Sequence, residues 1–125
     1  MNAGGQIDKE RRRYPRLNLN IQVEYSVIRG DEAAKTQSKN ISAGGICLIL
    51  YEDIQPDSIL ELKFYLPRDA DPIKAIGRVV WRSEIVVADD KRTRFDAGIE
   101  FLEISDTDRT KITQHVFSLL QQGRE

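Results

Sequence analysis

Residues 17–27 alternate strictly between apolar and polar side chains. A repeat of two residues is the spacing of a β-strand, in which successive side chains point to opposite faces of the sheet. The segment therefore predicts a half-buried strand. Its apolar face consists of Leu17, Leu19, Ile21, Val23, Tyr25 and Val27, and its polar face of Asn18, Asn20, Gln22, Glu24 and Ser26.

Five later segments also have the character of strands, and most are bounded by turn-forming residues such as Arg29-Gly30-Asp31, Pro56-Asp57-Ser58 and Asp89-Asp90-Lys91. They cover approximately residues 35–42, 46–51, 59–66, 73–88 and 93–102. Six strands at this spacing, with no helix between them, predict a small antiparallel barrel or sandwich.

The C-terminal segment changes to a helical repeat from about residue 105. Ser105 is a suitable N-cap, and the acidic residues Asp106 and Asp108 suit the positive end of a helix dipole. One amphipathic helix should therefore pack on the strands. Its apolar positions are Ile112, Val116, Leu119 and Leu120, with Phe117 beside them.

Length and composition predict one soluble domain. The chain has 125 residues, of which 40% are hydrophobic and 31% charged. No apolar run is long enough to span a bilayer, and no hydrophobic signal segment opens the sequence. Cys47 is the only cysteine, so an internal disulfide is excluded and a cytoplasmic location is expected. Because Cys47 lies within an apolar run, we expect it to fill the core rather than to act as a nucleophile.

Positive charge is concentrated near the N-terminus, although the net charge of the chain is only −1. Residues 1–10 are mainly polar and predict a flexible tail that precedes a domain at 11–125. Pro15 disfavours a helix at the residue before it, so the basic segment should be extended or turning. A local cationic segment on an otherwise acidic chain favours a compact anionic ligand over a long nucleic acid. The cations are Lys9, Arg11, Arg12, Arg13 and Arg16.

The sequence offers little for catalysis. His115 is the only histidine and falls within the predicted helix, and no second histidine or cysteine stands at metal-ligand spacing. The paired acids Asp89 and Asp90 fall in a turn, where carboxylates are usually solvated. We therefore expect no enzyme activity and no metal or cofactor.

Two short segments have the chemistry of a nucleotide site. The first is Arg12-Arg13-Tyr14-Pro15-Arg16; alone it resembles a solvated basic tail, yet arginine can grip phosphate, donate to guanine O6 and N7, and stack on a base. The second is Asn40-Ile41-Ser42-Ala43-Gly44-Gly45, which alone indicates a strand end and a glycine turn. Asn40 and Ser42 are two residues apart and should share one strand face, while Gly44 and Gly45 allow a ligand to approach the backbone closely.

Together these segments resemble the binding pattern of the PilZ family, an RxxxR segment followed by [D/N]xSxxG. Arg12 and Arg16 match the first part, and Asn40, Ser42 and Gly45 match the second, which begins 24 positions after Arg16. The stretches Gly77–Trp81 and Gly98–Phe101 also resemble the closing strands of such domains. The resemblance extends from about residue 10 to the final helix.

The resemblance implies an all-β fold, a six-stranded antiparallel barrel of split, Greek-key-like form with one C-terminal helix. It also implies a receptor for the bacterial second messenger cyclic di-GMP, without catalytic activity. Arg12 and Arg16 would hold guanine and phosphate, and Asn40, Ser42, Gly44 and Gly45 would line the other side of the ligand. Arg11 and Arg13 add cations, and Trp81 would lie either in the core or at the rim against a guanine.

The resemblance further implies a signalling adaptor. We expect the arginine arm to become ordered on the ligand and the changed surface to be sensed by an effector protein, which the sequence does not identify. Because Arg11 directly precedes RxxxR and can stack on a second guanine, we expect two nucleotides per chain. The alternatives are a small barrel whose basic arm binds RNA or DNA, and a PilZ-like scaffold that has lost nucleotide binding.

Overall fold

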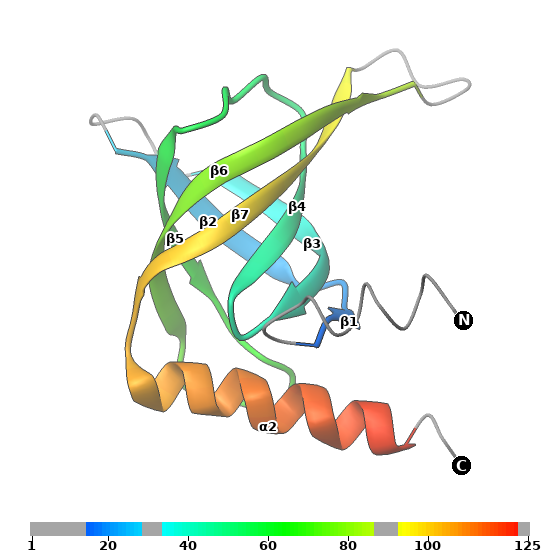
Figure 1. Cartoon of the computed structure of the whole chain (residues 1–125), viewed down its shortest axis with the longest axis vertical. Helices are drawn as coiled ribbons and strands as arrows, with labels where there is room; N and C mark the ends of the chain where they lie inside the picture. Colours follow the sequence, from blue (N-terminus) through cyan, green and yellow to red (C-terminus); the bar gives the residue numbers. More distant parts are fainter. Residues whose placement is uncertain (1–14, 29–33, 87–92, 123–125) are drawn as a thin grey trace, which may run out of the picture.

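The computed structural model describes residues 15–28, 34–86 and 93–122, and consists mainly of strands followed by one helix (Figure 1). The predicted turns at 29–31 and 89–91 lie outside the described residues. The elements are β1 (Leu17–Asn18), β2 (Gln22–Val27), β3 (Ala34–Ser42), β4 (Gly45–Leu50), β5 (Ile59–Phe64), β6 (Ile73–Ile85), β7 (Arg94–Ile104) and α2 (Asp106–Gln122).

Six of the strands close into an antiparallel barrel, which confirms the predicted fold class. The strands β2–β3–β4 and β5–β6–β7 form two consecutive antiparallel sets. Pairing of β4 with β7 and of β2 with β5 joins the two sets at both edges. The short strand β1 adds to the barrel by pairing with β3.

The prediction of one continuous strand over residues 17–27 is wrong in one respect, because the segment divides into β1 and β2. Leu17 pairs with Ile41, whereas Gln22 pairs with Gln37, so the register on β3 shifts by one residue between the two strands. The fully buried Ser38 bridges this break. Its hydroxyl donates to the Leu19 carbonyl and accepts from the Ile21 N–H, the latter at 3.1 Å.

Inward-facing side chains of the strands fill the barrel, as the alternating pattern predicts. The rings of Phe64 and Phe101 stack with centroids 6.3 Å apart. Burial of such side chains is the main favourable contribution to folding. Among the most deeply buried are Val23, Ile41, Leu48, Leu50, Leu60, Ile73 and Val79.

The helix α2 lies across one end of the barrel (Figure 1). Ser105 caps it as predicted, because its hydroxyl accepts from the Asp108 N–H at 3.0 Å. Ile112 and Val116 are buried in the common core, whereas Phe117 is half exposed. Lys111 forms an ion pair with Asp69 in the β5–β6 loop at 2.7 Å, and this contact lowers the pKa of the Asp69 carboxyl. No helix in the described part of the chain is long and apolar enough to cross a membrane.

Two β-bulges determine which residues face outward on one side of the barrel. On β3, Ser38 pairs with Leu48 and Asn40 with Cys47, so Lys39 is an extra residue. On β6, Val79 pairs with Ile99 and Trp81 with Gly98, so Val80 is an extra residue. Each bulge reverses the alternation of its strand.

Ser38→Ala tests the bridge between β1 and β2. The substitution leaves the Leu19 carbonyl and the Ile21 N–H without their side-chain partner, which should lower the free energy of unfolding by about 1–3 kcal/mol in urea titrations. Ser83→Ala, at an exposed position of β6, is the matched control and should change stability by no more than about 0.5 kcal/mol. Equal stability of Ser38→Ala and the unmodified protein would show that the bridge is dispensable.

Candidate functional site

Strand pairing brings residues from β3, β4, β7 and β6 into two parallel rows on the outer face of the barrel. Ser42 pairs with Gly45, Gly45 with Glu100, and Glu100 with Arg78. In the second row, Asn40 pairs with Cys47, Cys47 with Gly98, and Gly98 with Trp81. Three strand spacings of about 4.8 Å separate β3 from β6, so the rows span about 14 Å.

These rows form a pocket of about 200 Å³. Small residues from β4 and β7 line its centre, while β3 and Trp81 form its sides. A Cβ at Gly45 would lie 2.2 Å from the Ile99 carbonyl oxygen, so no side chain fits at that position. The described lining consists of Arg16, Asn40, Ser42, Gly44, Gly45, Ile46, Cys47, Val80, Trp81, Gly98, Ile99 and Glu100.

Trp81 lies at the rim of this pocket, and 44% of its surface is exposed. Its indole passes over Gly98, where an added Cβ would come within 2.1 Å of the indole Nε1 and 2.4 Å of Cε2. The missing side chain of Gly98 therefore makes room for the indole. The sequence predicts that Trp81 lies either in the core or at the rim, and in the structure it lies at the rim.

The β3–β4 turn is fixed by hydrogen bonds on both sides. The Gly44 N–H donates to the Ser42 hydroxyl at 3.2 Å, and the Gly44 carbonyl accepts from the Phe101 N–H of β7 at 2.9 Å. The two-residue turn, Ala43 and Gly44, is thus held against the neighbouring strand. Asn40 and Ser42 share the outer face, as predicted from their spacing.

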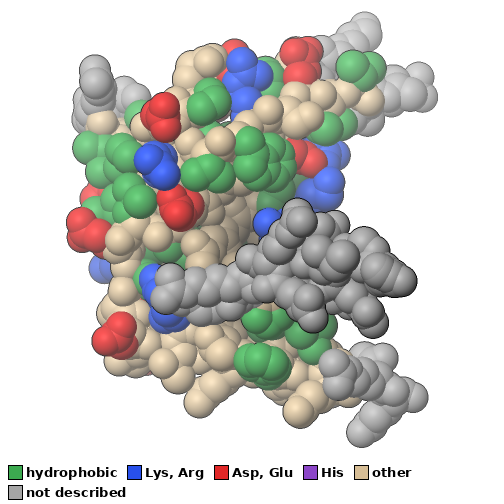
Figure 2. Space-filling view, viewed as in Figure 1, with side chains coloured by type: hydrophobic (Ala, Val, Ile, Leu, Met, Phe, Trp, Pro, Cys, Tyr) green, Lys and Arg blue, Asp and Glu red, His purple; other side chains and the backbone are tan. Residues whose placement is uncertain are grey.

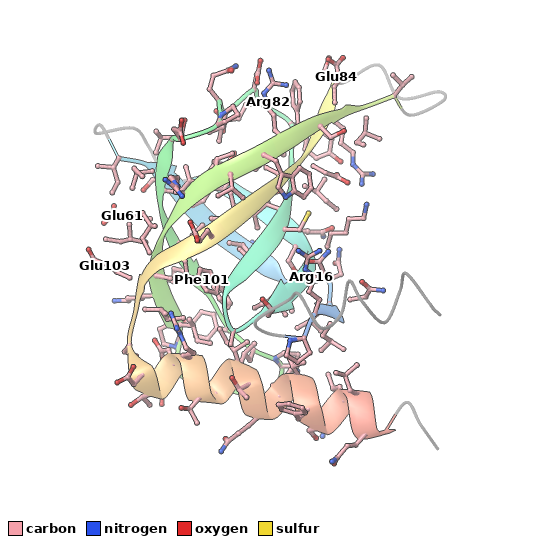
Figure 3. The ribbon with its side chains drawn as sticks, in the orientation of Figure 1. Arg16, Glu61, Arg82, Glu84, Phe101 and Glu103 are labelled. Atoms are coloured by element: carbon pink, nitrogen blue, oxygen red, sulfur yellow. The ribbon has the colours of Figure 1, made fainter. Side chains whose placement is uncertain are left out.

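Arg16 reaches the same pocket from the segment just before β1 (Figure 3). The pairing of Leu17 with Ile41 and of Asn18 with Asn40, continued by one residue, would set Arg16 opposite Ser42. Its side chain is exposed and hence accessible to a ligand. The other predicted cations of this segment, Arg11, Arg12 and Arg13, lie outside the described residues.

A buried carboxylate lies beside the pocket. Asp96, which is 4% exposed, pairs with Lys39 at 2.8 Å and with Arg94 at 3.2 Å. The hydrogen bond to Asp96 raises the pKa of Lys39. Since Lys39 is the extra residue of the β3 bulge, this ion pair holds the bulge that turns Asn40 outward.

Cys47 is buried, as expected, but it lies on the outer side of β4 at the bottom of the pocket. Burial, followed by the negative charge of Asp96, raises the pKa of its thiol. The thiol therefore stays protonated near neutral pH and is a poor nucleophile. Among the described residues, no group of three or more His, Cys, Asp or Glu side chains could hold a metal ion.

The sequence profile of the family described as "PilZ domain" matches residues 10–118, which is most of the chain. This chain belongs to the PilZ domain family. No curated protein has a sequence that matches it.

Solved structures of PilZ proteins have the same fold. The Bacillus subtilis inhibitor of motility, MotI/DgrA, shares 24% sequence identity at a TM-score of 0.76, over 92% of this chain and 54% of its own. The PilZ domain of YcgR from Escherichia coli, solved with c-di-GMP, shares 20% sequence identity at a TM-score of 0.70, and the match covers 91% of this chain and 95% of the YcgR domain. MrkH in the K. pneumonia MrkH–c-di-GMP complex shares 19% sequence identity at a TM-score of 0.74, and the match covers 91% of this chain and 54% of the MrkH chain. This PilZ domain therefore spans about half the length of the MotI/DgrA and MrkH chains.

Six described lining residues of the pocket in this PilZ domain are not among the site residues predicted from the sequence, namely Ile46, Cys47, Val80, Gly98, Ile99 and Glu100. The alternation of side chains along β4 could have predicted that Cys47 points outward, because Ile46 and Leu48 on either side of it are buried on the inner face. Gly98 and Glu100 follow from pairing between β4 and β7, whose register links residues about 50 positions apart. That register cannot be derived from local sequence.

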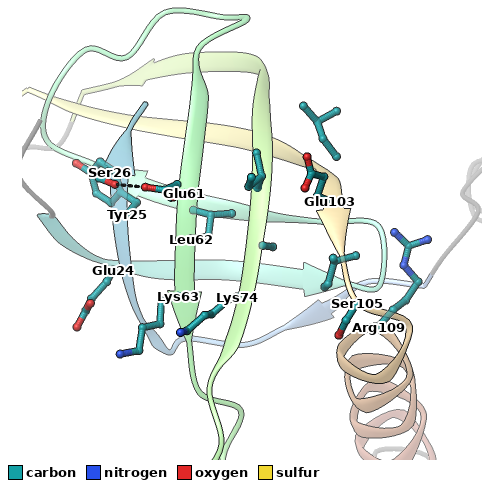
Figure 4. A pocket seen from close by; sticks show the side chains of 14 residues that line it. Glu24, Tyr25, Ser26, Glu61, Leu62, Lys63, Lys74, Glu103, Ser105 and Arg109 are labelled. Atoms are coloured by element: carbon teal, nitrogen blue, oxygen red, sulfur yellow. Dashed lines mark hydrogen bonds between the residues drawn. The ribbon is translucent and has the colours of Figure 1, made fainter. Parts of the chain in front are cut away.

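A larger hollow of about 640 Å³ lies elsewhere, on the outer side of β2, β5, β6 and β7 near the start of α2 (Figure 4). Its charged side chains are three acids and three bases: Glu24, Glu61, Glu103, Lys63, Lys74 and Arg109. The view in Figure 2 likewise shows hydrophobic, acidic and basic side chains interspersed over the barrel. An anionic ligand would meet three carboxylates in this hollow, so size alone does not make it the stronger candidate.

Proposed function

We propose that this PilZ domain binds cyclic di-GMP in the outer-face pocket and acts as a signalling adaptor without catalysing a reaction. The observation that carries the proposal is the convergence of Arg16, Asn40, Ser42, Gly45 and Trp81 on one pocket from three separate parts of the chain. Two similar structures, the YcgR PilZ domain and MrkH, are described with c-di-GMP bound. This likeness supports the choice of ligand.

The chemistry of the lining matches the parts of this ligand. The Arg16 guanidinium offers paired donors to a phosphate or a guanine edge, and the Asn40 amide can donate and accept. The Ser42 hydroxyl adds a further donor next to the turn. Trp81 presents exposed aromatic surface on which a purine can stack, a contact that typically contributes about 1–3 kcal/mol per base.

The described pocket is smaller than the 300–1,000 Å³ or so of typical small-molecule sites. We propose that Arg11, Arg12 and Arg13 complete it by folding over the nucleotide. The ligand would favour this closed state through contacts that exist only there. The surface so formed would be recognised by an effector protein.

Replacement of Arg16 or Ser42 tests the site. Arg16→Ala should weaken cyclic di-GMP binding by about 2 kcal/mol, or roughly 30-fold in Kd, because a charge-assisted contact is lost. Ser42→Ala should weaken it by about 1 kcal/mol with little change in melting temperature. Calorimetric titration measures the affinity of both variants, and thermal unfolding measures the melting temperature. Lys63→Ala, in the other hollow, is the control and should keep normal affinity.

Unchanged affinity in both variants would contradict the proposed site. A large fall in the melting temperature of Ser42→Ala at normal affinity would assign the turn a structural role only. Titration of the unmodified protein with GMP and with a short RNA distinguishes the nucleic-acid alternative, which requires steep salt dependence and affinity that grows with RNA length.

The number of bound nucleotides tests the role proposed for Arg11. Two molecules of cyclic di-GMP have four phosphates, which Arg11, Arg12, Arg13 and Arg16 could neutralise in a partly desolvated site. We expect two nucleotides per chain when the protein is titrated well above the dissociation constant, and a count closer to one for Arg11→Leu. A sharp end point at one nucleotide per chain in the unmodified protein would contradict this stoichiometry.

A further inference from the structure

The pocket contains a carboxylate, which is an unexpected group in a site for an anion. Glu100 is the only acidic residue among its described lining residues. It stands on β7 between Gly45 of β4 and Arg78 of β6, and half of its side chain is exposed. Because Gly45 has no side chain, nothing from β4 covers Glu100 on that side of its row.

Arg78 balances the charge of this carboxylate. Its Nη2 lies 2.9 Å from Oε1 of Glu100, and both side chains remain about half exposed. A carboxylate has two oxygens and about four lone-pair sites, so one bond from Arg78 leaves acceptor capacity free. The pair as a whole is neutral and does not by itself repel a phosphate.

Few groups on cyclic di-GMP can donate a hydrogen bond to a carboxylate. Its phosphates, guanine O6 and guanine N7 are acceptors only. Its donors are the guanine N1–H and N2 amino group, which lie side by side on one base edge, and the ribose 2′-hydroxyl. Two adjacent N–H donors match the two oxygens of a carboxylate, as in other bidentate contacts. Adenine has no donor at N1 or C2 and cannot make this contact.

The neutral polar side chains that could accept from this edge, Ser42 and Asn40, have a weaker capacity, and the Ser42 hydroxyl already accepts from the Gly44 N–H. Asn40 is a neutral amide with one acceptor oxygen, and it lies in the neighbouring row, two strands away from Glu100. Trp81, on the far side of Gly98, provides the surface on which the base can stack. A base stacked on the Trp81 indole, which covers Gly98, would lie on the same face of the barrel as Glu100, two residues further along β7.

We propose that Glu100 reads the N1–H and N2 amino edge of guanine and so selects cyclic di-GMP against other cyclic dinucleotides. The inference rests on the proposed function, since it requires that a cyclic dinucleotide occupies this pocket. It assigns base selection to β7, outside the two sequence segments that carry the nucleotide-binding pattern.

Analogues that differ in one base group test this assignment. In the unmodified protein, cyclic di-GMP should bind roughly tenfold or more tightly than cyclic di-IMP, which lacks the N2 amino group, and still more tightly than cyclic di-AMP. In Glu100→Gln the preference for cyclic di-GMP over cyclic di-IMP should fall to about threefold or less, because the charged acceptor is lost. Calorimetry measures all three ligands on both proteins.

Two control variants test whether base selection depends on the Glu100 carboxylate itself, on negative charge along β7, or on the ion pair with Arg78. Glu103→Gln removes one negative charge from the same strand but outside the pocket, and Arg78→Gln breaks the ion pair while keeping the carboxylate. Both should keep the tenfold preference. Loss of the preference in Arg78→Gln as well would assign base selection to the ion pair rather than to the Glu100 carboxylate.

The outcomes for the two proposals differ. If the unmodified protein binds none of the cyclic dinucleotides, the proposed function fails. If it binds cyclic di-GMP but Glu100→Gln keeps the full preference, only the role of Glu100 is overturned. Equal weakening of cyclic di-GMP and cyclic di-IMP in Glu100→Gln would also overturn it, because the carboxylate would then face the ribose.

Discussion

The extra residue in β3, held by the ion pair between Lys39 and the buried Asp96, determines which side chains face the pocket. Before the bulge, Ser38 points inward and bridges the gap between β1 and β2. After it, Asn40 and Ser42 point outward while Ile41 still fills the core. Without the extra residue, the inward position of Ser38 would place Asn40 inside the barrel. A buried charge with two cationic partners is costly to disrupt, so this arrangement is well fixed.

A second bulge acts in the same way on the opposite side of the pocket. Regular alternation along β6 would place Trp81 on the same face as Ile73, Ala75 and Val79, which are buried. The extra residue Val80 turns Trp81 outward onto Gly98. The two bulges therefore form the facing sides of one site, and the two strands between them, β4 and β7, belong to the same closed barrel. A ligand at this site meets a largely preformed surface.

These bulges also mark the limit of prediction from the sequence. The six strands of the barrel and their order along the chain, the final helix and its Ser105 cap follow from local periodicity and could be predicted. The shared face of Asn40 and Ser42 was predictable because no bulge separates them. The rim position of Trp81 and the division of residues 17–27 were not, since each depends on strand register set by distant residues. Glu100 escaped notice because its segment indicates only an ordinary strand until pairing brings it beside Gly45.

The central claim, that cyclic di-GMP occupies the outer face of β3, β4, β7 and β6, is tested most directly by amide chemical-shift mapping. In a ¹H–¹⁵N titration, the amides of Gly45 and Gly98 and the indole N–H of Trp81, the only tryptophan, should shift most. Amides of β2 and β5 around Glu24 and Glu61 should stay nearly unchanged. If the largest shifts instead fell on β2 and β5, the nucleotide would bind in the other hollow and the account would be contradicted.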